Sequence, residues 1–174
     1  MSDRPRIFCS GKINNDGEMA QWRVDLGFKE LFPKSLDRLK TIEALSKGFP
    51  PNLDPNYWVA PLGSEVDYCG PYPLIEGAPK GELRRSIYLL CRTLVRHATH
   101  LFCWVDHPDC HGAITEIAWA RDDQHVFIAY PETMKDLSKE MWFVNQRAFN
   151  RDEGLLFDRV EDAWLYFLTR IEVD

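Results

Sequence analysis

The feature that most constrains the fold is an alternation of short apolar runs with amphipathic segments. The runs are typical of buried strands because they are brief and end at Gly, Pro or polar loops, and they cover 6–11, 57–62, 101–105, 125–130 and 155–157. Apolar residues spaced three or four apart indicate helices between them, over 18–32, 36–45, 82–97, 113–121, 133–149 and 158–171. This alternation predicts an α/β fold, with a parallel sheet of about five strands and helices on both faces.

Length and pattern favour one domain over residues 1–174. This length is sufficient to bury a continuous core, and the sequence contains no internal repeat or low-complexity segment. The least regular part is 63–81, where six Gly and Pro residues lie between positions 70 and 81. These residues predict a long loop, and long loops in compact domains are often functional.

Charge and cysteine content limit the partners that the chain is expected to have. A net charge of −6 does not suit a nucleic-acid polymer, which needs a basic face, although one or two arginines can still bind a small anionic ligand. The five Cys form no CxxC pair, and we find neither a secretion signal nor a run of about 20 apolar residues for a membrane span. We therefore expect free thiols, a cytoplasmic location and no membrane partner.

Ligands of open α/β sheets bind beyond the carboxyl ends of the strands. Loops that begin at Ser10, near Pro61, at Asp106 and at Pro131 are expected at that edge. The third loop is the richest in reactive side chains. It leads into a helix that is expected to begin near residue 113 and to carry Glu116 in its first turn.

Glu116 is the candidate catalytic residue of this segment. The positive end of the helix dipole favours its ionised form, and an ionised carboxylate at the ligand edge can act as a nucleophile or stabilise an oxocarbenium-like centre. Gly112, just before it, would let the backbone pass close to a sugar. The alternative is structural, because Glu is favoured in the first turn of a helix by capping alone.

Two segments resemble the nucleoside 2-deoxyribosyltransferase-like family. Cys103-Trp-Val-Asp106 followed by Gly112-Ala-Ile-Thr-Glu116-Ile-Ala-Trp-Ala120 is similar to the central signature of that family: an apolar strand, an acidic loop, a Gly and, four residues later, a Glu. Ile7-Phe-Cys-Ser-Gly11-Lys-Ile13 is similar to its first strand and its Gly-containing substrate loop. The resemblance covers residues 6–13 and 82–130.

The resemblance implies a flavodoxin-like fold and homo-oligomers with active sites near subunit interfaces. It also implies that Glu116 attacks the anomeric carbon of a nucleoside or nucleotide and forms a glycosyl-enzyme. Water then completes hydrolysis, whereas a second base completes transfer. No cofactor is expected.

Two positions depart from the family pattern. An Asp of the transferases six residues before the Glu is replaced by Cys110, and a second Asp, in the preceding helix, is replaced by Cys91. The sequence therefore favours hydrolysis over transfer. An NAD glycohydrolase and a non-catalytic nucleotide-binding sensor remain alternatives, and the base, the sugar and the need for a 5′-phosphate stay open.

The remaining expected site residues surround Glu116. Asp109 and His111 are candidates for the acid or base, or for ribose ligands. The expected substrate-binding residues are Ser10, Gly11, Ile13, Arg23, Asp106 and Gly112. The first three would form the floor of a sugar or phosphate pocket, and Arg23 would hold a phosphate or a ribose hydroxyl.

Two other chemistries are conceivable for the same loop. His107, Cys110 and His111 are zinc-ligand types, but their spacing matches no standard zinc site, so no metal is expected. Cys110 could act as a nucleophile with His111, but nothing supplies the third, orienting group. Both hypotheses rank below the one based on Glu116.

Overall fold

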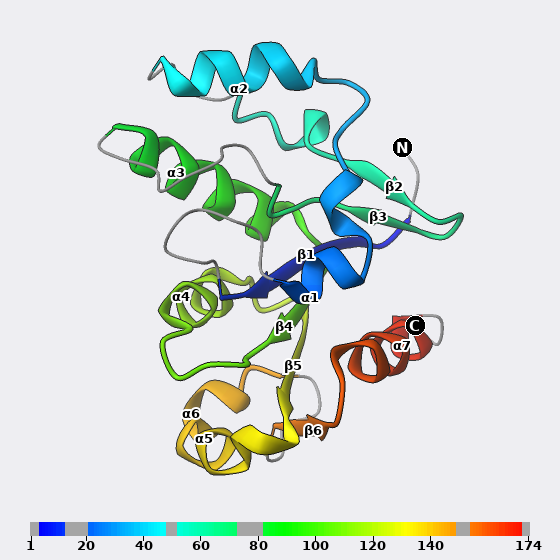
Figure 1. Cartoon of the computed structure of the whole chain (residues 1–174), viewed down its shortest axis with the longest axis vertical. Coiled ribbons are helices and arrows are strands. Elements are labelled where there is room, and N and C mark those ends of the chain that lie inside the picture. The colour runs from blue at the N-terminus through cyan, green and yellow to red at the C-terminus, as the bar shows by residue number, and fades with distance from the viewer. Residues whose placement is uncertain (1–3, 13–20, 48–51, 73–81, 149–153, 172–174) are drawn as a thin grey trace.

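A computed structural model of the chain describes residues 4–12, 21–47, 52–72, 82–148 and 154–171. Six strands form one sheet in the order β2-β3-β1-β4-β5-β6 (Figure 1). They are β1 (Arg6–Gly11), β2 (Ala60–Leu62), β3 (Val66–Tyr68), β4 (His100–Trp104), β5 (His125–Pro131) and β6 (Leu155–Phe157). The helices are α1 (Gln21–Asp25), α2 (Arg38–Ser46), α3 (Glu82–His97), α4 (His111–Trp119), α5 (Lys135–Glu140), α6 (Trp142–Asn145) and α7 (Val160–Ile171), with 3₁₀ turns η1 (Phe28–Glu30), η2 (Pro55–Tyr57) and η3 (Glu132–Met134).

The strand order gives the fold class. β3, β1, β4, β5 and β6 are parallel neighbours, and only β2 is antiparallel. Numbered along the chain, the five parallel strands have the order 2-1-3-4-5, which is the flavodoxin-like form of a doubly wound sheet. The predicted parallel α/β sheet is confirmed, with six strands in place of about five.

The predictions for the segment 57–81 were wrong in two respects. Only Ala60–Leu62 of the expected second strand is extended, and it pairs antiparallel to β3. The expected loop contains β3 itself, whose three residues are too few for a periodic pattern to show. Because β2 is antiparallel, the loop after it lies at the edge of the sheet opposite to the carboxyl ends of the parallel strands. The segment after β3 lies at the carboxyl-end edge instead, and the backbone N–H of Cys9 donates to the Gly70 carbonyl there.

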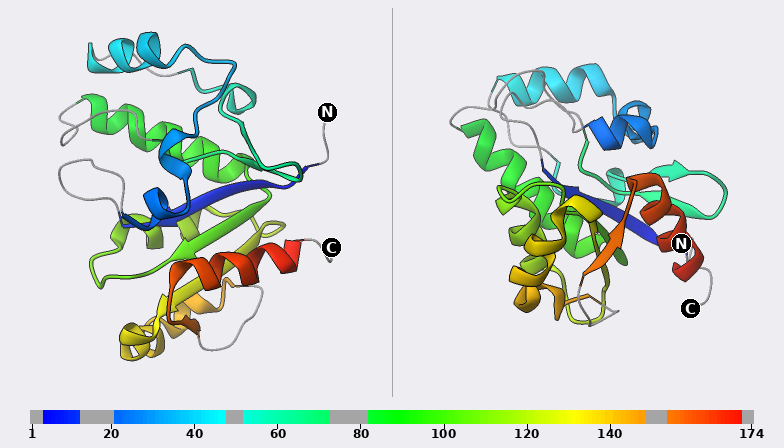
Figure 2. Two further views of the ribbon diagram at one scale, coloured as in Figure 1. Left: turned by 45° about the vertical axis from the view of Figure 1, so that its right-hand side comes forward. Right: turned by 60° about the horizontal axis from the view of Figure 1, so that its bottom comes forward.

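Helices cover both faces of the sheet, as predicted. Figures 1 and 2 show α3, α4 and α5–α6 on one face, and α1 and α7 on the other. Side chains alternate across each strand. Phe102 of β4 therefore packs against Trp164 and Phe167 of α7, while its neighbour Cys103 faces the side covered by α3 and α4.

Several helix boundaries differ from the expected ones. The segment 18–32 is divided because Gly27, with φ 78°, separates α1 from η1; residues 18–20 lie outside the described part of the chain. The helix expected from residue 113 begins two residues earlier, at His111. Among the described helices, none is long and apolar enough to cross a membrane.

Candidate active site

The sheet reverses its order between β1 and β4. In a doubly wound sheet the crevice at this switch point, beyond the carboxyl ends of the strands, is the usual place for a ligand. Ser10 and Gly11 end β1 and pair in register with Cys103 and Trp104 of β4. The loop that follows β4 leads directly into α4, so the segments that carry Ser10 and Glu116 meet at this switch point.

Glu116 and Ser10 are in direct contact there. Ser10 Oγ donates a hydrogen bond of 2.5 Å to Glu116 Oε2, across 106 residues of sequence. The Glu116 side chain is only 6% exposed, and Ser10 is fully buried. Glu116 is the only buried carboxylate in the described part of the chain. The structure therefore brings together two of the predicted site residues around one carboxylate.

The protonation of Glu116 differs from expectation. Because α4 begins at His111, Glu116 lies in the second turn of the helix, and the first turn carries no acidic residue. The helix dipole and N-terminal capping, which act on the first turn, therefore do not account for the presence of Glu116 at this position. Burial raises the pKa of Glu116 to about 7, while the hydrogen bond from Ser10 and the positive charge of Arg23 partly oppose this rise. The carboxyl group thus titrates close to neutral pH.

Two thiols lie within electrostatic range of Glu116. Burial, with the Glu116 charge as the second cause, raises the pKa of both Cys91 and Cys103 well above the usual range. Both are therefore neutral at physiological pH. Cys91 of α3, at the position where the resemblance implies an Asp, is thus a neutral thiol within electrostatic range of Glu116.

Arg23 occupies a place different from the expected one. Its side chain is 1% exposed, and its guanidinium donates to the carbonyls of Cys9 at 3.0 Å, Gly11 at 3.3 Å and Lys12 at 3.0 Å. It also stacks on Trp22, with Cζ 4.3 Å from the ring centroid. Arg23 therefore organises the end of β1, and its charge acts on Glu116 through space, whereas the sequence suggested a ligand for phosphate.

The glycines of the expected site have unequal roles. A Cβ on Gly11 would lie 2.8 Å from Trp22 Cζ2 and 2.9 Å from the Trp104 carbonyl oxygen, so this close approach requires glycine. Gly112 is exposed within α4, and a Cβ there would meet nothing within 4 Å. Ile13, expected beside Gly11, lies outside the described residues.

The side chains of the loop before α4 mostly contact other residues of the same loop. Asp109 is exposed, and its carboxylate lies 3.5 Å from His107 Nδ1. The Cys110 thiol donates to Asp106 at 3.8 Å, and burial followed by the Asp106 charge raises its pKa. Cys110 is thus neutral, which disfavours it as a nucleophile.

His111 is exposed at the start of α4. Within the described part of the chain, neither His111 nor Asp109 forms a hydrogen bond or ion pair with Glu116. In the same residues, no three His, Cys, Asp or Glu side chains are grouped so that they could hold a metal ion.

Comparison with other proteins adds nothing to this geometry. No family model, curated protein or solved structure matches the chain. The resemblance to nucleoside 2-deoxyribosyltransferase-like proteins therefore stays a prediction.

Proposed function

We propose that the protein hydrolyses the N-glycosidic bond of a nucleoside or nucleoside monophosphate, with Glu116 as nucleophile. The observation that carries the proposal is the buried Glu116 carboxyl, hydrogen-bonded to Ser10 at the switch point of a flavodoxin-like sheet. A buried carboxylate is costly to ionise, and strongly shifted carboxyl groups in clefts are candidates for catalysis. The homo-oligomeric state implied by the resemblance, and the cytoplasmic location expected from the free thiols and the absence of a secretion signal, belong to the same proposal.

The reaction proceeds in two steps. The ionised Glu116 attacks the anomeric carbon through an oxocarbenium-like transition state, and the C–N bond breaks with its electron pair leaving on the base. The base takes up a proton, for which His111 and Asp109 at the start of α4 are the candidate donors. Water then attacks the glycosyl-enzyme ester, which releases the sugar and restores Glu116.

The protonation state of Glu116 sets the pH profile. With a pKa of about 7, the fraction of ionised nucleophile rises as the pH rises through neutrality. Ser10 helps to orient the carboxylate, because an ionised carboxylate can only accept hydrogen bonds and the Ser10 hydroxyl donates to it. The rate of base release should therefore increase from pH 6 to pH 8, and the acid limb should reflect Glu116.

The test is a mass-spectrometric screen of nucleosides, nucleoside monophosphates and NAD for a released base. Glu116→Gln keeps the shape of the side chain and should abolish release, and Ser10→Ala should reduce it. Glu132→Gln is the matched control, because Glu132 is an exposed carboxylate that follows β5 at the same edge of the sheet. Undiminished release by Glu116→Gln would contradict the proposal, and nicotinamide as the released base would direct it to NAD.

A second candidate function is a nucleotide-binding protein without turnover. The observation in its favour is that a thiol, Cys91, lies near Glu116 where the family has a carboxylate. This candidate predicts saturable binding of a nucleotide in the crevice, with no base released during prolonged incubation at high protein concentration.

A further inference from the structure

A cavity of about 420 Å³ lies between α3 and the end of α4, away from Ser10 and Glu116. Arg92 and Arg96 of α3 line one side, and Trp119, Arg121 and Asp122 line the other. Its volume falls within the range of about 300–1,000 Å³ typical of sites for small molecules. The lining is rich in guanidinium groups although the whole chain has a net charge of −6.

The charges of the cavity leave a positive excess. Arg121 forms a two-pronged ion pair with Asp123, with contacts of 2.9 and 3.3 Å, and Asp122 is paired with Arg147 at 2.9 Å. These pairs are close to neutral. Two other cations of the lining, Arg92 and Arg96, form no ion pair with another described residue, and both are exposed.

Arg92 and Arg96 also repel each other. They are four residues apart on one helix, so their Cβ atoms are neighbours on its surface, and like charges at this spacing destabilise a helix. An anion bound between them would remove this repulsion.

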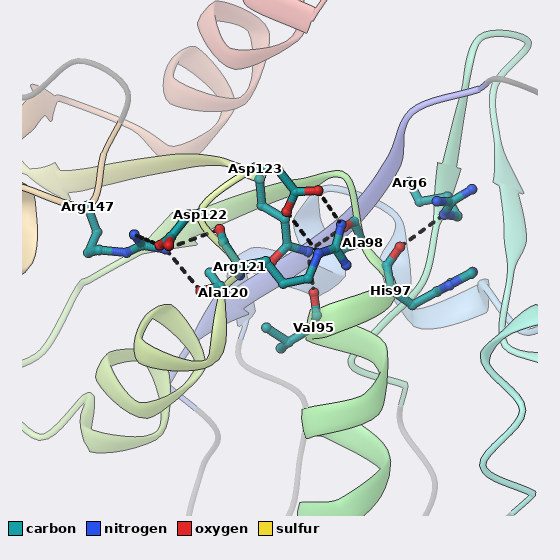
Figure 3. A network of polar contacts seen from close by, with 10 residues as sticks. Arg6, Val95, His97, Ala98, Ala120, Arg121, Asp122, Asp123 and Arg147 are labelled. Atoms are coloured by element: carbon teal, nitrogen blue, oxygen red, sulfur yellow. Dashed lines mark hydrogen bonds and ion pairs between the residues drawn. The ribbon is translucent and has the colours of Figure 1, made fainter.

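The loop that carries Arg121 is fixed against α3 before any ligand binds. Arg147 donates to the carbonyls of Ala120 at 2.9 Å and Arg121 at 3.1 Å (Figure 3). The buried amide of Gln124 accepts from the Arg121 backbone N–H and donates at 2.7 Å to the Val95 carbonyl, near the end of α3. A preorganised site loses less entropy on binding than a mobile one.

We propose that this cavity binds a small molecule that carries a pyrophosphate group, either inorganic pyrophosphate or a nucleoside diphosphate. Guanidinium groups form charge-assisted, two-pronged hydrogen bonds with phosphoryl oxygens. Two unpaired guanidinium groups one helical turn apart match two linked phosphoryl groups better than one. Trp119, which Tyr88 contacts edge-on at 4.9 Å between ring centroids, provides an apolar wall. The inference is independent of the chemistry of Glu116.

The experiment is isothermal titration calorimetry of the full chain with inorganic pyrophosphate, ADP and orthophosphate at physiological ionic strength. The test variant is Arg92→Gln/Arg96→Gln. The matched control is Arg84→Gln/Arg85→Gln, which removes the same charge from exposed positions of the same helix outside the cavity lining. Glu116→Gln is included to separate this cavity from the crevice at Ser10, and circular dichroism establishes that each variant is folded.

The proposal expects saturable 1:1 binding of pyrophosphate that the test variant weakens by about tenfold or more, because two charge-assisted contacts are lost. The control pair and Glu116→Gln should bind as the parent does. Tighter binding of ADP than of pyrophosphate would assign the ligand as a nucleoside diphosphate, and equal binding would assign it as free pyrophosphate. Equal affinity for orthophosphate, absence of saturable binding, or an undisturbed Arg92→Gln/Arg96→Gln variant would overturn it.

Discussion

At the scale of single residues, Glu116 carries the proposed chemistry, and its burial has a cost in stability. Its side chain is almost completely buried, and one serine hydroxyl is its hydrogen-bond partner in the described structure. Burial favours the neutral acid, whereas Ser10 and Arg23 favour the carboxylate. Burial is the largest of these effects, and the resulting pKa near 7 makes ionisation possible at physiological pH but unfavourable for folding.

This cost can be measured as a pH dependence of stability. A Glu in an unfolded chain ionises at about 4.3, so the raised folded-state pKa contributes stability that is complete below that pH and is lost as the pH rises through about 7. The loss amounts to about 4 kcal/mol. Glu116→Gln lacks it, so the variant should gain stability relative to the parent between pH 5 and pH 8. Urea denaturation of both proteins at the two pH values tests this, and parallel pH profiles would contradict it.

Arg23 is expected to control Glu116 without touching it. Arg23→Met removes a buried charge and three hydrogen bonds, to the carbonyls of Cys9 and Gly11 in β1 and of Lys12 just after it, so we expect a loss of about 2–4 kcal/mol in the free energy of unfolding. The pKa of Glu116 should rise further because an opposing positive charge is lost. A ¹³C NMR titration of the Glu116 carboxyl measures this shift.

The exposed Arg92→Met is the control for Arg23→Met, since it removes the same charge from a side chain that is not among the causes of the raised Glu116 pKa. Arg23→Lys should recover part of the pKa shift, because it restores the charge without the planar fork. An unchanged Glu116 titration in Arg23→Met would show that the two residues are not coupled.

Sequence patterns could suggest candidate residues but not the contacts that these residues make. Ser10 and Glu116 were both expected at the site, yet their hydrogen bond depends on the register of β1 with β4 and on the placement of α4, which local patterns do not contain. Arg23 was expected to hold a phosphate or a ribose hydroxyl because it follows the first loop, whereas the structure buries its side chain. Its three carbonyl acceptors become neighbours only when the end of β1 curves around it.

At the scale of elements, long periodic segments were predictable and short ones were not. The 16-residue α3 has the predicted bounds because its apolar stripe is regular. By contrast, β3 has three residues, and η1 follows a single left-handed glycine. The start of α4 was misplaced by two residues because Cys110, its N-cap residue, makes no side-chain capping hydrogen bond, so no capping motif marks it.

The surroundings of Gly11 and Gly112 predict opposite effects on stability when alanine replaces each glycine. Gly11→Ala places a methyl group 2.8 Å from Trp22 Cζ2 and 2.9 Å from a backbone oxygen, and such overpacking should cost about 1–3 kcal/mol. Gly112→Ala meets open space within a helix, and should stabilise the protein by about 0.4–1 kcal/mol. Thermal unfolding of the two variants side by side provides the comparison. A Gly11→Ala variant as stable as Gly112→Ala would refute the close packing.

At the scale of the whole molecule, the alternation of strands and helices predicted the class of fold, because parallel strands need crossover helices. The position of the antiparallel β2 at the edge could not be predicted, since three residues pair either way with little difference in pattern. The strand order places the switch point between β1 and β4. This one topological fact brings together both segments that resemble nucleoside 2-deoxyribosyltransferase-like proteins.

The central claim is that Glu116 becomes covalently linked to a sugar during cleavage of an N-glycosidic bond. The most direct measurement is acid quenching of the protein during incubation with a substrate found in the screen, followed by mass spectrometry of the peptide that contains Glu116. The account predicts released base together with a sugar adduct on Glu116 that is absent from Glu116→Gln. Base release by Glu116→Gln at the rate of the parent, with no adduct on either protein, would contradict it.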